Sequence, residues 1–287
     1  MRNTFDRCAA RIVLMIAPAA FSIAHVSAGP ILGTNGSTFA ILGGAGVVVN
    51  GTGSVITGSV GGCCNATSVT GYPAAFTDSG GTVYDTGTLP TATETGGQAD
   101  LLAAINALNA LGPVTAESTL NGKTLTPGYY SIGATTLTGT LTLNAEGNSN
   151  ALFVIFESSS LTTDGGSDVQ IINDGSGAGI GVYWVMTASA FLGNTTGDST
   201  FYGNILANGT ITLGSGVTDS CGSLLTQVDS VTLAGTDTVG IGCQAGGSLV
   251  NGVITALPSS AVPEPSTFFL LAPGLAGLVI LRSRLAK

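Results

Sequence analysis

Positive charge is almost absent from the interior of this chain. Of its 7 Lys and Arg residues, three lie before residue 12 and three after residue 281, so Lys123 stands alone between them. Proteins that bind nucleic acid neutralise its phosphates with clustered Lys and Arg side chains. The sequence therefore excludes nucleic acid as a partner.

Histidine is equally scarce, since His25 is the single His and lies in an N-terminal stretch that we expect to be removed. Without His no Ser-His-Asp triad forms, and the cysteines lack the spaced Cys-x-x-Cys pairs of a zinc site. A polysaccharide hydrolase needs paired carboxylates, and the nearest candidates are Asp164 with Asp168 and Asp219 with Asp229. These acids are explained more simply as turn residues. We therefore predict a protein that is not an enzyme, with no metal site and no cofactor.

Charged residues of either sign make up only 8% of the chain, against about a quarter in typical globular domains. Fourteen acids and one Lys lie between Gly29 and Ala261, which gives this part a net charge of −13 (14 minus 1). The chain is nevertheless 44% hydrophobic, which disordered chains are not. Its 44 Gly residues and frequent Ser and Thr suit a repetitive β fold with many tight corners.

Residues 1–28 have the features of a secretory signal. Three Arg precede an apolar run at residues 12–21, and the small residues "VSA" at 26–28 precede Gly29. This order of basic, apolar and small residues is typical of a segment removed by signal peptidase. An uncleaved membrane anchor is the alternative.

The C-terminal end has the features of a second targeting signal. A linker at residues 258–266 contains the motif Val262, Pro263, Glu264 and Pro265, and residues 267–287 hold a 14-residue apolar run and a basic tail. The run is shorter than the ~20 residues that span a bilayer comfortably. Motif, run and tail together resemble the PEP-CTERM sorting signal of Gram-negative bacteria. The resemblance implies recognition by an exosortase-type enzyme, a transient inner-membrane anchor, and a final place outside the cell or on its outer surface.

A short pattern recurs between Lys123 and Gly240. An apolar centre is flanked by small, mostly hydroxylated residues, and the centres are 24, 30, 20 and 20 residues apart. Neighbouring residues of a strand point to opposite faces, and such spacings are typical of solenoid coils. The pattern predicts a β-solenoid with centres inside and flanks outside. The centres are Leu137, Leu161, Phe191, Ile211 and Val231, and the flanks are Thr136/Thr138, Ser160/Thr162, Ala190/Leu192, Thr210/Thr212 and Ser230/Thr232.

One helix is expected, at about residues 98–111. Leu101, Ile105, Leu108 and Leu111 recur at helical spacing, and a Gly-Pro pair follows. We expect this helix to lie along one side of the solenoid and the strands before residue 62 to close one of its ends. Residues 29–257 then form a single domain.

Four cysteines remain after processing, namely Cys63, Cys64, Cys221 and Cys243. An exported protein can form disulfides, and four cysteines allow three pairings. Cys221 with Cys243 is the preferred pair, because their separation of 22 positions is close to one coil.

Six segments resemble the ice-binding-protein-like domain of microbes. They are "LGTNGSTFAILGG" at 32–44, "LTPGYYS" at 125–131, "TLTGTLTLNAEG" at 136–147, "NALFVIF" at 150–156, "GVYWVMTASAFLGNTT" at 181–196 and "FYGNILANGTITLGSGVT" at 201–218. The resemblance implies an all-β fold, a right-handed β-solenoid of triangular section with one long helix packed alongside. It also implies that ice, or ordered water, binds to one flat face. The stretch "TGSVGGCCN" departs from the family's usual pattern and leaves the geometry near Cys63 and Cys64 open.

The hydroxylated flanks form the candidate ice-binding face. Thr offers a methyl group, a hydroxyl and a stiff χ1, and many weak contacts add up to affinity. The candidates are Thr136, Thr138, Ser160, Thr162, Thr210, Thr212, Ser230 and Thr232, with Ala190 and Leu192 as an interruption. The alternative is a cell-surface or matrix adhesin or scaffold without ice activity, with exopolysaccharide as its partner.

Overall fold

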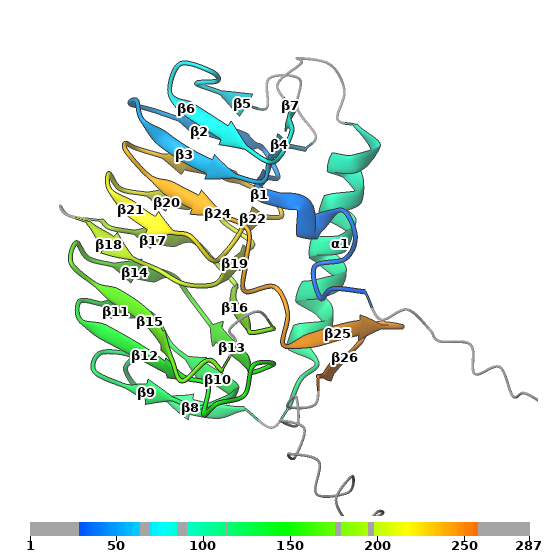
Figure 1. The fold of residues 1–287 in the computed structure, drawn as a ribbon, viewed down its shortest axis with the longest axis vertical. Helices are drawn as coiled ribbons and strands as arrows, with labels where there is room; N and C mark the ends of the chain where they lie inside the picture. The colour runs from blue at the N-terminus through cyan, green and yellow to red at the C-terminus, as the bar shows by residue number, and fades with distance from the viewer. Residues whose placement is uncertain are drawn as a thin grey trace, which may run out of the picture.

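The computed structural model describes residues 29–63, 69–84, 91–112, 114–175, 179–194 and 198–257. In these residues the chain winds into a solenoid of three parallel sheets with one helix beside it (Figure 1). The expected all-β solenoid with a single helix is thus confirmed. The predicted signal peptide, linker and sorting segment lie outside the described residues. Among the residues that the structure describes, no helix is long and apolar enough to cross a membrane.

Each full coil contributes one strand to each sheet, which we call sheets 1, 2 and 3 in chain order. Sheet 1 contains β7 (Val83–Tyr84), β4 (Ser59–Gly62), β1 (Phe39–Gly43), β22 (Leu224–Thr226), β19 (Asn204–Ala207), β16 (Gly181–Met186), β13 (Leu152–Glu157), β10 (Gly128–Ile132) and β8 (Thr115–Glu117). Sheet 2 contains β11 (Thr135–Leu137), β14 (Leu161–Thr163), β17 (Ala190–Leu192), β20 (Ile211–Leu213), β23 (Ser230–Leu233), β2 (Gly46–Val49) and β5 (Val69–Thr70). Sheet 3 contains β6 (Phe76–Ser79), β3 (Ser54–Thr57), β24 (Thr238–Gly240), β21 (Val217–Asp219), β18 (Ser199–Thr200), β15 (Asp168–Ile172), β12 (Thr140–Asn144) and β9 (Thr124–Leu125).

Sheet 1 is buried on both faces. Along β13, Phe153 and Ile155 point into the solenoid core, while Leu152 and Val154 pack in a second cluster with the helix. A strand buried on both faces must be apolar at nearly every position. This explains why sheet 1 has continuous apolar runs while sheets 2 and 3 alternate.

The helix α1 (Ala92–Asn109) covers the outer face of sheet 1. The prediction that it begins at about residue 98 is wrong, because a capping box starts it earlier. The Thr91 hydroxyl accepts from the Glu94 backbone amide at 3.3 Å, and the Glu94 carboxylate accepts from the Thr91 amide at 2.8 Å. Gly97 is useful inside the helix, since a Cβ there would lie 2.9 Å from the Phe39 ring.

The N-terminal strands extend the solenoid instead of packing across it. In sheets 1, 2 and 3, β1, β2 and β3 pair in parallel with β22, β23 and β24 respectively. The first and last coils of the chain are therefore neighbours. Helix α1 then runs back along the solenoid to β8, from which the chain climbs again (Figure 1).

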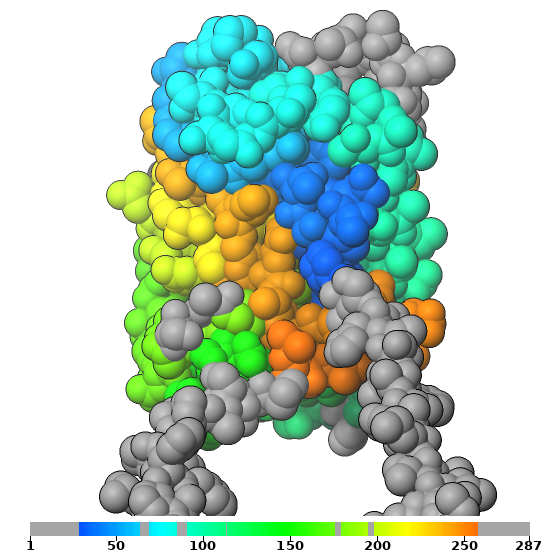
Figure 2. Space-filling model, turned by 45° about the vertical axis from the view of Figure 1, so that its right-hand side comes forward, coloured from blue at the N-terminus to red at the C-terminus, as the bar shows by residue number. Residues whose placement is uncertain are grey.

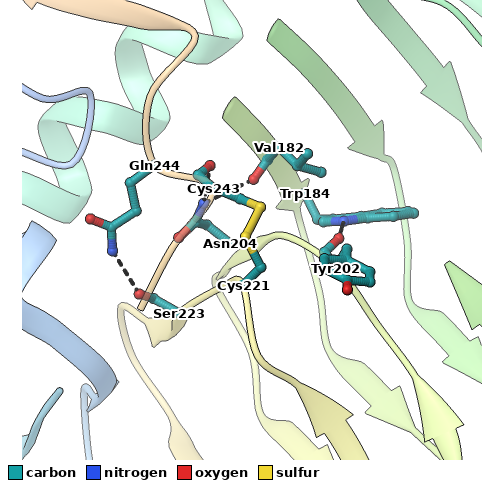
Figure 3. The surroundings of a disulfide bond; sticks show 8 residues. All are labelled: Val182, Trp184, Tyr202, Asn204, Cys221, Ser223, Cys243 and Gln244. Carbon is teal, nitrogen blue, oxygen red and sulfur yellow. Dashed lines mark hydrogen bonds between the residues drawn. A yellow bond between two sulfur atoms is a disulfide. The ribbon is translucent and has the colours of Figure 1, made fainter. Parts of the chain in front are cut away.

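A disulfide joins Cys221 to Cys243, with 5.3 Å between their Cα atoms, as the sequence predicted. Beside it the Asn204 side-chain amide donates to the carbonyls of Val182 and Cys243 at 3.0 and 2.8 Å (Figure 3). The disulfide and the Asn204 amide together hold the segment after β24 against the first residues of β16 and β19 in sheet 1. Cys64 lies outside the described residues.

Among the described residues, three acids are buried in the solenoid, namely Asp219, Asp237 and Glu157. Asp219 and Glu157 are 0% and 1% exposed. Burial raises the pKa of the Glu157 carboxyl from 4.5 to about 8, although the backbone amide of Ser159 offsets part of the effect. Burial also raises the pKa of Asp219 well above its usual range, against the opposing amides of Cys221 and Gly203. The Glu157 carboxyl is therefore mainly protonated at neutral pH.

Replacing both bridged cysteines by Ser should lower the free energy of unfolding. The disulfide joins residues with a sequence separation of 22. Closing a loop of that size with a disulfide stabilises the folded state by about 3 kcal/mol. Urea denaturation of wild type and of Cys221→Ser/Cys243→Ser, both without reductant, measures the loss. A difference that disappears when both proteins are reduced is the control, and equal midpoints without reductant would contradict the assignment.

Glu157→Gln should flatten the pH dependence of stability. Between pH 4.5 and 8 the folded chain keeps a proton on Glu157 that the unfolded chain has released, so wild-type stability falls as pH rises through this window. The slope approaches about 1.4 kcal/mol per pH unit. Urea denaturation at pH 5 and pH 8 should show the variant gaining stability relative to wild type at the higher pH. A constant difference between the two proteins would refute the buried-acid explanation.

Candidate functional site

Two of the three solenoid sides are open to a ligand in the described residues. Helix α1 covers sheet 1, while sheets 2 and 3 present one alternating face each to solvent. A flat binding surface must therefore lie on sheet 2 or sheet 3.

Each strand of sheet 2 contributes one outward residue to a central row. In β20, Thr212 is partly exposed between Ile211 and Leu213, which are both 0% exposed. In-register pairing aligns these outward residues from coil to coil, about 4.8 Å apart. The central row of sheet 2 runs Thr136, Thr162, Phe191, Thr212, Thr232, Val48 and Thr70.

The rung at β17 is the reverse of the prediction. Phe191 points outward and is 37% exposed, whereas Ala190 and Leu192 are 0% and 1% exposed. The reason is register, since Phe191 pairs with Thr162 on one side and Thr212 on the other. The row is thus interrupted by one aromatic ring. Ala190 and Leu192 belong to the core.

Most other predicted site residues border this row. Ser160, Thr210 and Ser230 precede Thr162, Thr212 and Thr232 by two positions and are partly exposed, so they lie about 6.7 Å along the strand on the same face. Thr138 is different. It lies at the corner towards sheet 3, where its amide donates to the Asn121 side chain at 2.8 Å.

Sheet 3 carries a second row that the sequence reasoning missed. It runs Thr140, Asp168, Thr200, Thr218, Thr238, Val55 and Thr77. A signal for it exists in the sequence, because Thr218 and Thr238 each follow a Thr of the sheet 2 row by six residues. Five residues, which include one corner, therefore separate the two outward positions of a coil.

The two open faces differ in charge. The outward strand positions of sheet 2 carry no carboxylate in the described residues, and small Ser, Thr and Gly side chains flank the row. Sheet 3 has the Asp168 carboxylate within its row, and beside it the Gln170 amide spans to the Thr142 hydroxyl at 3.1 Å. A carboxylate is costly to strip of its own water, so a dry or ordered-water contact fits sheet 2 better.

Asp219 and Asp229 do not form one site. Asp219 points from β21 into the solenoid core, whereas Asp229 is exposed just before β23. Asp164 lies at a corner and Asp168 in an open row. Across the part of the chain that the structure describes, no three His, Cys, Asp or Glu side chains group to hold a metal ion.

Comparison with known proteins gives one family. The family described as ice-binding-like matches residues 41–239. An ice-binding protein of Nostoc sp. (strain HG1) is 37% identical over 262 residues, which cover 90% of this chain and 88% of the relative.

Solved structures agree with this match. The crystal structure of an ice-binding protein from the Antarctic ascomycete Antarctomyces psychrotrophicus has a TM-score of 0.63 at 31% identity, covering 74% of this chain and 98% of that one. An ice-binding protein from an Antarctic biological consortium has a TM-score of 0.64 at 29% identity, covering 74% and 91%.

Proposed function

The chain belongs to the ice-binding-like family, and from this premise we propose that it adsorbs to ice through sheet 2. The observation that carries the proposal is the central row of sheet 2, an in-register line of seven outward residues of which five are Thr and none is a carboxylate. The protein acts by adsorption and needs no catalytic group.

Rigidity and spacing support adsorption to a solid. The strands hold the row at a repeat of about 4.8 Å, with the flanking Ser and Thr about 6.7 Å away along the strand. The hydroxyls of Thr136, Thr162, Thr212 and Thr232 have no protein hydrogen-bond partner among the described residues, so they can hold ordered water. Their β-branched side chains have little rotamer freedom to lose.

Affinity comes from number, because each such contact is weak and the contacts act together. The row spans seven strands, and six intervals of 4.8 Å give a length of about 29 Å. The methyl groups exclude loose water from between the hydroxyls, while the small flanking residues leave the surface level. Phe191 is the one large side chain that breaks the line.

Export is part of this proposal. The secretory features of residues 1–28 and the sorting motif Val262–Pro265 support passage across the inner membrane of a Gram-negative bacterium to the medium or the outer surface. Signal peptidase and an exosortase-type enzyme are the partners during that passage. The disulfide Cys221–Cys243 fits an oxidising compartment.

Thr212→Tyr should reduce thermal hysteresis and ice recrystallisation inhibition by roughly tenfold, because one large ring lifts several neighbouring contacts from the crystal together. The matched control is Thr218→Tyr, which makes the same change at a partly exposed Thr of the same coil on sheet 3. The control should keep nearly full activity.

The pair of variants also decides between faces. Loss in Thr218→Tyr with full activity in Thr212→Tyr would move the ice-binding face to sheet 3. A wild-type protein without any effect on ice growth would favour the alternative, a surface or matrix scaffold that meets exopolysaccharide.

Phe191→Thr should raise thermal hysteresis by about twofold, because it joins the Thr pairs on either side of the ring into one continuous row. Leu192→Thr is the control for register. Leu192 is 1% exposed, so this variant should lose about 2–4 kcal/mol of unfolding free energy and gain no activity. Thermal denaturation and hysteresis are measured on both proteins, and the reverse outcome would show that the register is wrong.

A further inference from the structure

Both ends of the described chain meet at a small antiparallel hairpin. The hairpin consists of β25 (Gly247–Val250) and β26 (Val253–Ala256). The Leu249 amide donates to the Gly29 carbonyl at 3.1 Å, and the Leu257 amide donates to the Gly246 carbonyl at 3.1 Å. Gly29 and Leu257 also line one common hollow with Gly247. The chain therefore enters and leaves the described domain at one place.

That place is the corner at which sheet 3 leads into sheet 1. The segment after β24 of sheet 3 runs against the start of β16 of sheet 1, where the Val182 amide donates to the Cys243 carbonyl at 2.9 Å. Gly181 forms an isolated antiparallel bridge with Gln244. Figure 2 shows the blue N-terminal segment and the orange C-terminal segment side by side on this part of the surface.

The corner is rigid enough to define an orientation. Ile254 of β26 is 8% exposed. It belongs to the same apolar cluster as Leu101 of helix α1 and as Ile31, which lies before β1. The disulfide Cys221–Cys243 fixes the segment that leads into the hairpin. A support attached at Leu257 is thus connected through packed residues to helix α1 and to sheet 1.

The opposite side of the solenoid is sheet 2. Because each coil has three sides, the corner between sheets 3 and 1 faces away from the remaining side. Sheets 3 and 1 flank the corner, so a support attached there restricts access to both. Sheet 2 is the one side turned directly away from it.

We propose that this domain is built to display sheet 2 away from a support to which its C-terminal end is attached, leaving that face free for ice. This inference rests on the proposed function. It assigns an orientation that the proposed function does not require, because a free protein can rotate until sheet 2 meets the ice.

Two attachment points test the orientation. Full-length chain carrying Leu257→Cys or Val228→Cys is coupled to beads through the new thiol without reductant, and unmodified chain measures background coupling. Leu257 lies at the hairpin corner, and Val228, which is 67% exposed, lies between β22 and β23 at the corner of sheets 1 and 2. Beads coupled through Leu257→Cys should adsorb to a growing ice surface at least about tenfold more than beads coupled through Val228→Cys at equal loading.

The free variants separate the two ideas. Both soluble proteins should keep wild-type thermal hysteresis, which tests ice binding independently of attachment. Active free proteins whose beads adsorb equally through both positions, or better through Val228→Cys, would overturn the orientation alone. Free protein without ice activity would overturn the proposed function and this inference with it.

Discussion

The parallel pairing of each strand with the strand one coil away is the constraint on which this molecule depends. It places Thr212 beside Thr232 and Ile211 beside Val231. Outward positions therefore align with outward positions, and inward with inward, along the whole side. A slip of one residue would bury the row and expose the core. Corners absorb the unequal coil lengths, and the strands keep their register in spite of the spacing of 30 residues between Leu161 and Phe191.

Helix α1 determines which sides can serve a ligand. By covering sheet 1 it makes apolar residues necessary on both faces of strands such as β13 and β16. The polar capacity of each coil is then confined to sheets 2 and 3. Both receive an outward Thr from the same alternating pattern, so the fold offers two rows and does not by itself select one.

The sequence predicted what recurs and missed what depends on context. Spacing predicted the coil repeat and the helix, and it made Cys221–Cys243 the preferred one of three possible pairings. Phe191 was placed inside because a large apolar residue normally is, and only pairing with Thr162 shows that it is outside. The sheet 3 row was not predicted, because the recurring pattern was defined by the apolar centres of sheet 2, one corner before Thr218. The proposed site thus depends on register, which a single sequence does not contain.

Two independent features favour sheet 2 over sheet 3. The first is local, since Asp168 interrupts the sheet 3 row with a carboxylate that holds its own hydration shell. The second is global, since Gly29 and Leu257 meet at a corner that borders sheet 3 and opposes sheet 2. Charge and chain exit arise from different parts of the sequence and have no structural reason to agree. Their agreement is what a surface shaped for contact with an extended solid requires, because such a contact must be level in itself and also clear of everything attached to the domain.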